Sequence, residues 1–386
     1  MIRKIKRNDS GPAQVSKMLM TDSKTVAAAS PSQIFRWKFV KHKFAVASLI
    51  LLGAMYLMAG FAEFFAPYDP YSIKSELVLA PAQKLHFIDS SGSFNPRPFV
   101  YKLQKSIDIE SGRIIYSEDI SKPMPLQMFV HGDPYKFLGL IHSDIHLFGV
   151  AGGEVYSPLG KDQLGRDLFS RIVFGARISL TLGFIGVLAG FFAGLILGGI
   201  AGLRGGWFDF ILIRITEVLT SIPTLPIWLA LAVALPQNWT VLQTFVAITL
   251  ILALFDVISG ASRTIRGKFM ALKEEGYVQA AKLDGAGTGR IIRRYLFPNF
   301  FSHQIAELTL AIPSMILAET TLSFLGLGLQ PPAISWGVLL QDCRAVRVLD
   351  TAPWLFIPAL FVVVTILAFN FIGDGLRDAA DPYSRV

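Results

Sequence analysis

Three residues near the middle of the chain have the types and spacing that could bind a metal ion. His142, Asp144 and His146 alternate, so in an extended segment their side chains would share one face. Imidazole and carboxylate groups are ordinary zinc ligands, but a structural zinc site uses four protein ligands and no fourth ligand is evident. The same pattern is typical of an ordinary surface strand, and we expect no metal site here.

Motifs for catalysis are absent from the sequence. The phosphate-binding pattern G-x-x-x-x-G-K-[ST] does not occur, so we expect that this chain does not itself bind ATP. The sequence also has no nucleophile elbow, H-E-x-x-H helix or kinase motif set. The single cysteine, Cys343, excludes an intramolecular disulfide and a cysteine metal cluster, and we expect it to be inert. The prediction is therefore a chain without enzymatic activity and without a bound cofactor.

A few ionisable residues lie within apolar stretches, where an unpaired charge is costly. Glu319 lies two-thirds of the way along its stretch, so a role in packing and a role in a transport pathway are both open. Arg214 and Glu217 are three residues apart, a spacing that allows an ion pair on a helix. Asp256 and Glu307 lie near the ends of their stretches.

The elements that hold these residues are apolar runs long enough to cross a bilayer. Of the 386 residues, 52% are hydrophobic, and the mean hydropathy of +0.50 is high for a soluble domain. A spanning helix needs roughly 20 residues, and a signal-peptide core is shorter. We predict an all-α polytopic membrane protein with six transmembrane helices. The six runs are Phe44–Ala66, Ile178–Leu203, Phe210–Leu235, Val241–Ser259, Ile305–Leu327 and Pro353–Ile372.

The distribution of charge predicts an orientation. The net charge of +8 could suggest nucleic acid, but the cationic residues collect in particular loops, as orientation signals do. Residues 1–43 hold ten Lys or Arg against two Asp, and residues 260–304 hold eight against three acidic residues. We therefore place 1–43, 260–304 and the tail 373–386 in the cytoplasm. Residues 67–177 and 328–352 are predicted to lie outside.

The outside segment 67–177 is too long for a simple connector and should fold. Residues 99–105 alternate, and residues 107–109 and 113–116 flank a glycine turn at 110–112, which predicts two short strands. We expect a small extracytoplasmic insertion that contains β-structure.

Small residues and prolines shape the spans themselves. The second run, within the segment 178–372 that holds the later spans, has glycine at every fourth position, which gives one helix face a smooth stripe that another helix can approach closely. The alternative is that glycine is simply common in membrane helices. Pro223, Pro226 and Pro313 each remove a backbone donor and favour kinks. The glycines are Gly186, Gly190, Gly194, Gly198 and Gly202.

One inside segment has two helical pieces. Residues 275–287 are compatible with a helix that stops at glycines suited to a C-cap. A second piece begins near Thr288 and is predicted to end at Pro298. A basic loop lying on anionic lipid is the alternative interpretation.

This segment resembles the cytoplasmic signature of ABC importer permeases, in which a Glu-Ala-Ala triplet is followed by a glycine and a Leu-Pro-like ending. Here the triplet has Gln in place of Glu, which removes a charge, and the small residues after it are kept. The resemblance implies a coupling helix that lies in a groove of an ATPase subunit. The residues that would contact the ATPase are Tyr277, Gln279, Ala280, Ala281, Gly285 and Pro298.

Further motifs are similar to the second, C-type permease of the peptide and nickel importer family. They occupy residues 65–70, 157–167, 322–328 with 335–337, and 373–378. The insertion from about 72 to 150 lies outside this resemblance.

The resemblance implies the ABC importer permease fold and a bacterial inner-membrane location. The implied partners are a homologous permease in a heterodimer, two ATPases that bind ATP and Mg, and an extracytoplasmic solute-binding protein. Peptides are the expected substrates, with nickel or an oligosaccharide as alternatives. A secondary transporter or channel is the alternative class, and it would normally use buried acids near mid-membrane, where Glu319 stands alone.

Overall fold

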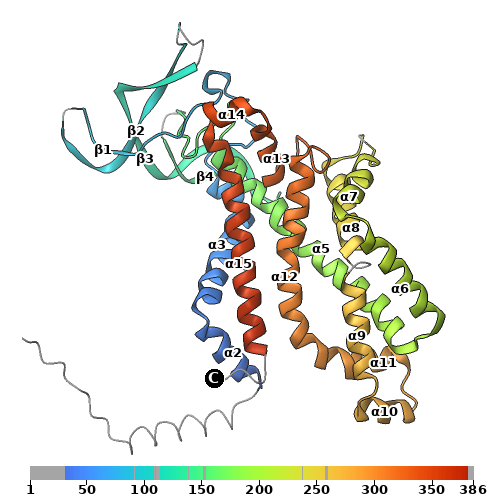
Figure 1. Ribbon diagram of the computed structural model, residues 1–386. Coiled ribbons are helices and arrows are strands. Elements are labelled where there is room, and N and C mark those ends of the chain that lie inside the picture. Colours follow the sequence, from blue (N-terminus) through green and yellow to red (C-terminus); the bar gives the residue numbers. More distant parts are fainter. Residues whose placement is uncertain are drawn as a thin grey trace, which may run out of the picture.

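The computed structural model is a bundle of helices with a four-stranded sheet at one end (Figure 1). It describes residues 31–90, 92–107, 109, 114–137, 139–150, 154–236, 238–256 and 260–380. The longer helices are α2 (Pro31–Lys41), α3 (Lys43–Gly60), α5 (Leu168–Arg204), α6 (Gly206–Ser221), α7 (Thr224–Val233), α8 (Val241–Asp256), α9 (Ser262–Leu272), α10 (Gly276–Leu283), α12 (Phe297–Phe324) and α15 (Ile357–Ala380). Shorter pieces are α4 (Ala62–Phe65), α11 (Thr288–Ile291), a π-helical turn (Ile292–Leu296), α13 (Trp336–Leu340) and α14 (Val346–Thr351).

Among the described residues, four helices are long and apolar enough to cross a membrane, namely Lys43–Gly60, Leu168–Arg204, Gln304–Phe324 and Pro353–Ala380. They correspond to the first, second, fifth and sixth predicted spans. The third predicted span is not one helix, because α6 and α7 meet at an angle of 92°. The fourth is the shorter apolar helix α8.

The break in the third span has a local cause. Pro223 has no N–H to donate and restricts the residue before it to extended backbone. Ile222 accordingly has φ −97° and ψ 132°, which ends α6. By contrast, α12 runs unbroken through Pro313.

Helix α5 begins ten residues earlier than the predicted span. It has 37 residues, which is about 55 Å at 1.5 Å per residue. A hydrocarbon core is only about 30 Å thick, so α5 is longer than is needed to cross it. Asp167 caps this helix by accepting a hydrogen bond from Ser170 N at 2.8 Å.

The sheet is antiparallel in the order β1-β2-β3-β4. Its strands are β1 (His86–Ile88), β2 (Phe94–Ile107), β3 (Ile114–Phe137) and β4 (Ile141–Val150). The predicted hairpin is confirmed in its pairing, since Ile107 lies opposite Ile114. Its strands are much longer than expected, and residues 110–112 of the predicted turn lie outside the described residues.

The main core lies where α5, α12, α13 and α15 meet. Trp336 at the start of α13 is fully buried and donates a hydrogen bond from Nε1 to the carbonyl oxygen of Ile172 at 3.1 Å. A second, smaller core at the opposite end includes Phe269, Val278 and Leu296. In Figure 1, α10, α2 and the end of α15 lie at this second end, while the sheet and α14 lie at the other.

Candidate functional site

The helix predicted to contact an ATPase, α10, lies at the end of the bundle opposite the sheet (Figure 1). Val278 and Ala281 are its buried residues, with 0% and 3% of their surface exposed. Tyr277 is 39% exposed and Leu283 89% exposed. Ala280 is also exposed. The helix therefore has one face seated in the second core and one apolar face open.

The predicted contact residues divide between these two faces. Tyr277 and Ala280 lie on the open face, whereas Ala281 is turned into this chain. Gln279 is partly buried, and its Nε2 donates a hydrogen bond to the carbonyl oxygen of Lys273 at 2.9 Å. A glutamate could not donate this hydrogen bond, which gives the Gln in the triplet a structural reason.

Gly285 ends α10 in the way predicted for a glycine C-cap. Its φ is +76°, a left-handed conformation that favours glycine, and its N–H donates to the carbonyl oxygen of Lys282 at 3.0 Å. A Cβ atom at this position would meet nothing within 4 Å in this chain. The glycine is thus required by the backbone, and the space beside it is open.

The expectation that Pro298 ends a helix is wrong. Pro298 lies in the first turn of α12, which continues to Phe324. Proline is tolerated there because the first backbone N–H groups of a helix have no partner within the helix. The side-chain surroundings of Pro298 lie outside the described residues.

The glycine stripe of α5 faces two other helices of the same chain. A Cβ atom at Gly186 would lie 3.2 Å from Met315 of α12, and one at Gly194 would lie 2.9 Å from Cβ of Ala261, just before α9. At Gly198 it would meet the carbonyl oxygen of Ser262. Gly190 is buried in α5. Because α9 leads directly to α10, the stripe holds the segment that carries the predicted coupling helix.

Ion pairs add to this arrangement. Arg266 of α9 binds Asp209 of α6 through two hydrogen bonds, with NH2 to Oδ2 at 2.7 Å. The predicted Arg214–Glu217 pair is confirmed, at 2.7 Å between NH1 and Oε2. Glu307, which the sequence placed near a span end, is exposed.

Glu319 is fully buried in α12 and contacts residues of this chain. Its Oε1 accepts hydrogen bonds from Ser323 Oγ and Ser335 Oγ, both at 2.8 Å. Ser335 caps α13, because its side chain accepts a hydrogen bond from Val338 N. These contacts favour a role of Glu319 in packing. A role of Glu319 in the transport pathway stays a prediction.

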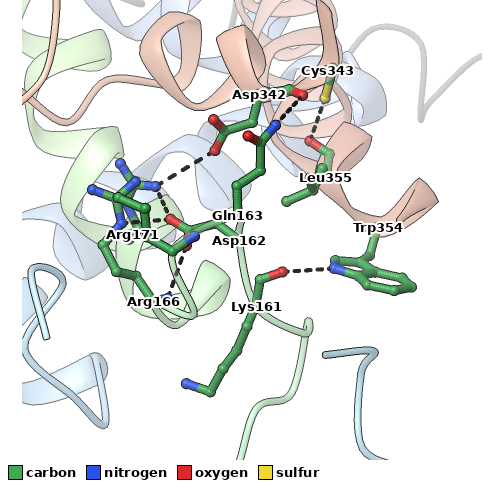
Figure 2. Close-up of polar contacts among 10 residues, drawn as sticks. Lys161, Asp162, Gln163, Arg166, Arg171, Asp342, Cys343, Trp354 and Leu355 are labelled. Carbon is green, nitrogen blue, oxygen red and sulfur yellow. Dashed lines mark hydrogen bonds and ion pairs between the residues drawn. The ribbon is translucent and has the colours of Figure 1, made fainter. Parts of the chain in front are cut away.

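A buried ion cluster lies at the N-terminal end of α5, at the end of the bundle that holds the sheet (Figure 2). Asp162 is fully buried and binds Arg166 Nε at 2.7 Å as well as Arg171 NH1. It also accepts hydrogen bonds from the backbone N–H groups of Leu164 and Arg166. Asp342, far along the chain, lies 4.0 Å from Arg171.

The same region holds the segment before α15 in place (Figure 2). Gln163 Nε2 donates to the carbonyl oxygen of Asp342 at 3.0 Å, and Trp354 Nε1 donates to that of Lys161 at 3.0 Å. This cluster was not predicted from the sequence, although Asp162 and Arg166 are four residues apart, a spacing that allows an ion pair. Nothing in the sequence indicates the contact with Asp342.

Two of the three suggested metal ligands have other partners. His146 is buried, and its ring nitrogens contact the carbonyl oxygens of Ala66 at 2.6 Å and Asp133 at 3.0 Å. Asp144 pairs with His131 at 2.9 Å. Within the described residues, no group of three His, Cys, Asp or Glu side chains is placed to hold a metal ion.

The comparison that decides the family covers the C-terminal half of the chain, from within α5 onward. The family described as the binding-protein-dependent transport system inner membrane component matches residues 194–386, half of the chain. The chain belongs to this family. The permease also matches the N-terminal transmembrane domain of oligopeptide transport permease C over residues 30–82, which confirms the resemblance to C-type subunits. It is thus a multi-pass inner-membrane permease of an ABC importer.

The chain is also similar to individual permease proteins of peptide transport systems. The permease is 44% identical over 228 residues to the dipeptide transport system permease protein of Bacillus subtilis, covering 58% of this chain and 68% of that one. It is 40% identical to the oligopeptide transport system permease protein of Haemophilus influenzae, and the match covers 60% of this chain and 72% of the relative. It is 41% identical to the glutathione transport system permease protein of Pectobacterium atrosepticum, and the match covers 58% of this chain and 72% of the relative.

One solved structure is also similar. It shows inward-facing conformations of the MetNI methionine ABC transporter and matches 55% of this chain and 98% of its own, at 19% identity and a TM-score of 0.38.

Proposed function

We propose that the permease forms half of the translocation path of an ATP-driven peptide importer. A homologous permease would supply the other half, and two ATPase subunits would bind at the end of the bundle that carries α10. The extracytoplasmic binding protein would deliver its solute at the opposite end, beside the sheet. The substrates in the relatives' names, which are dipeptides, oligopeptides and glutathione, support peptides over nickel or an oligosaccharide.

The observation that carries this proposal is the open face of α10. Leucine side chains on a surface helix are normally turned toward the core, yet Leu283 is 89% exposed. Burying such a side chain contributes about 1.5–3 kcal/mol. A partner surface that covers Leu283, Ala280 and Tyr277 would gain this contribution, and the small residue at 280 would allow a close approach.

Movement of α10 would reach the membrane through rigid contacts. Its buried face packs in the same core as Phe269 of α9, and α9 lies against the glycines of α5. An ATPase that binds α10 differently in its two nucleotide states would therefore bias the bundle between two arrangements.

The remaining features follow from this arrangement. ATP and Mg would bind only to the partner subunits, and this chain would have no catalytic step of its own. The basic segment 260–304 and both chain ends would lie in the cytoplasm, the sheet would lie outside, and α6–α7 with α8 would complete six spans. A secondary transporter or channel is not favoured, because the family is one of binding-protein-dependent permeases.

Leu283→Asp is the test of this proposal. A carboxylate on the open face would have to be buried without a partner, so we expect at least a tenfold loss of ATPase association, equal to about 1.4 kcal/mol. The measurement is copurification of the ATPases, together with substrate-stimulated ATP hydrolysis in reconstituted vesicles. The matched control is Leu140→Asp, which changes a leucine that is 82% exposed at the opposite end. Equal ATPase association in both variants would overturn the docking assignment.

A further inference from the structure

A cavity of about 280 Å³ lies between the sheet and the N-terminal end of α5. Its walls come from residues 67–74, from β3 and β4, and from residues 154–167. Charged side chains of both signs line it, including Lys161, Asp167, Asp133 and Glu154. It lies apart from α10, at the other end of the bundle, and its lining residue Lys161 directly precedes Asp162 of the ion cluster.

Lys161 supplies a buried positive charge. Only 2% of its surface is exposed, and its backbone is fixed by Ala80 and Trp354. Its side chain extends away from Asp162 (Figure 2). The Nζ atom lies 5.8 Å from the centre of the Tyr68 ring. Within the part of the chain that the structure describes, Nζ makes no ion pair within 4.0 Å.

Asp167 supplies a buried negative charge with one oxygen in use. Its Oδ2 accepts hydrogen bonds from Ser170 N and Ser170 Oγ, both at 2.8 Å. Its Oδ1 is buried and has no hydrogen-bond partner among the described residues. The side chain is 2% exposed and lines the cavity.

Among the described residues, neither of these two groups has an ion-pair partner within 4.0 Å. A buried charge without a partner is costly, and the two side chains share a cavity without closing an ion pair between them. Burial lowers the pKa of the Lys161 ammonium and raises the pKa of the Asp167 carboxyl, and the charge of each group partly offsets the shift of the other. A ligand that carries both charges close together would satisfy both groups at once.

We propose that this cavity binds a small zwitterion, with the ligand carboxylate on Lys161 Nζ and the ligand ammonium on Asp167 Oδ1. Pockets for drug-sized ligands have about 300–1,000 Å³, so this one suits a free amino acid or a dipeptide. The inference rests on the proposed function in one respect, because it takes this end of the bundle to face the incoming solute. It adds a second binding site, in the permease itself, for the class of solute that the binding protein delivers.

The test is equilibrium binding of radiolabelled glycine and diglycine to the assembled transporter in nanodiscs, without the binding protein and without nucleotide. Acetate and methylammonium, which carry one charge each, serve as competitors. Lys161→Met removes the positive charge at similar length, and Lys161→Arg keeps it. Asp167→Asn removes the negative charge but keeps the N-cap of α5, since asparagine caps as well as aspartate. Lys84→Met is the matched control, because Lys84 is exposed and does not line the cavity.

We expect saturable binding that Lys161→Met and Asp167→Asn each weaken at least tenfold, and that Lys161→Arg and Lys84→Met retain. Acetate and methylammonium should compete much less well than glycine. Relative affinity for glycine and diglycine tells whether the site takes a free amino acid or a peptide. Absence of saturable binding would mean that the cavity holds water only, and would overturn the inference. Binding unchanged by either cavity variant would overturn it too.

The same preparation separates this inference from the proposed function. Copurified ATPases and substrate-stimulated hydrolysis test the importer assignment independently of the cavity. A coupled transporter that binds no zwitterion would refute only the cavity site. A chain that associates with no ATPase would refute the importer assignment, whatever the cavity binds.

Discussion

At the scale of single residues, Asp162 contacts two arginine side chains and two backbone N–H groups at the end of the bundle that holds the sheet. It is fully buried and compensates two arginines, of which Arg171 is itself buried. Removing one partner of a buried ion pair typically costs about 3–5 kcal/mol, because the other charge is left without compensation. We expect Asp162→Ala to lower the thermal unfolding midpoint of the purified permease markedly.

The exposed pair between Lys102 and Glu154 offers the contrast. Its atoms are just as close, at 2.8 Å, but both side chains are more than 40% exposed. Surface pairs contribute little, so Lys102→Ala should leave the unfolding midpoint nearly unchanged. Equal shifts for the two variants would show that burial does not set the contribution of these pairs.

Cys343 gives a second prediction at this scale. Burial raises the pKa of its thiol to about 12, and the neighbouring Asp342 contributes in the same direction. Since the thiolate is the reactive form, a maleimide should label the native permease very slowly at pH 7.5, and the rate should rise as the pH is raised toward the thiol pKa. Labelling after denaturation in detergent is the positive control. Rapid labelling of the native protein at pH 7.5 would contradict the buried position.

At the scale of elements, the contact between α5 and α9 depends on the absence of side chains. A Cβ atom at Gly198 would collide with the backbone of Ser262, whereas one at Gly53 in α3 would meet nothing within 4 Å. Alanine is favoured over glycine in a helix by about 1 kcal/mol at either position. Overpacking costs about 1–3 kcal/mol and applies only at Gly198.

We therefore expect Gly198→Ala to destabilise the permease relative to Gly53→Ala. The difference in unfolding midpoint between the two variants isolates the helix contact, because the change in helix propensity is shared. Gly198→Ala should also weaken substrate-stimulated ATP hydrolysis, since α9 leads directly into α10 and a displaced α9 would displace the helix proposed to contact the ATPase. A midpoint for Gly198→Ala as high as that of Gly53→Ala would contradict the close approach.

The elements also show what could be predicted from the sequence. Four predicted spans and the hairpin around residue 110 follow from apolar length and alternation, which are local properties. At Ile222 the sequence predicts only a kink, because a proline does not determine the angle between the helices on its two sides. The observed angle between α6 and α7 is 92°. The inward orientation of Ala281 and the contact of Arg171 with Asp342 depend on packing between distant segments. The spacing of residues within a single segment therefore could not predict either of these two features.

At the scale of the whole molecule, the placement of the sheet and α10 at opposite ends leads to a prediction about orientation. Lys105 on β2 and Arg290 on α11 are both exposed. Since native Cys343 should react very slowly with maleimide, cysteines introduced at these two positions can report which side of the membrane each position faces. We expect a membrane-impermeant maleimide added to intact cells to label Lys105→Cys and to leave Arg290→Cys unlabelled until the membrane is opened. Labelling in the reverse order would invert the orientation inferred from the charges.

The length of α5 has a thermodynamic consequence. One uninterrupted helix joins the cavity and the Asp162 cluster at one end to the contact with α9 at the other. If a solute bound beside Asp167 shifts α5 and, through α9, the docking helix α10, the affinity for the ATPases at the far end would change by some factor. Linkage then requires that ATPase binding change the affinity for that solute by the same factor. Measuring either affinity with and without the other ligand would thus give one coupling free energy, and the two determinations must agree.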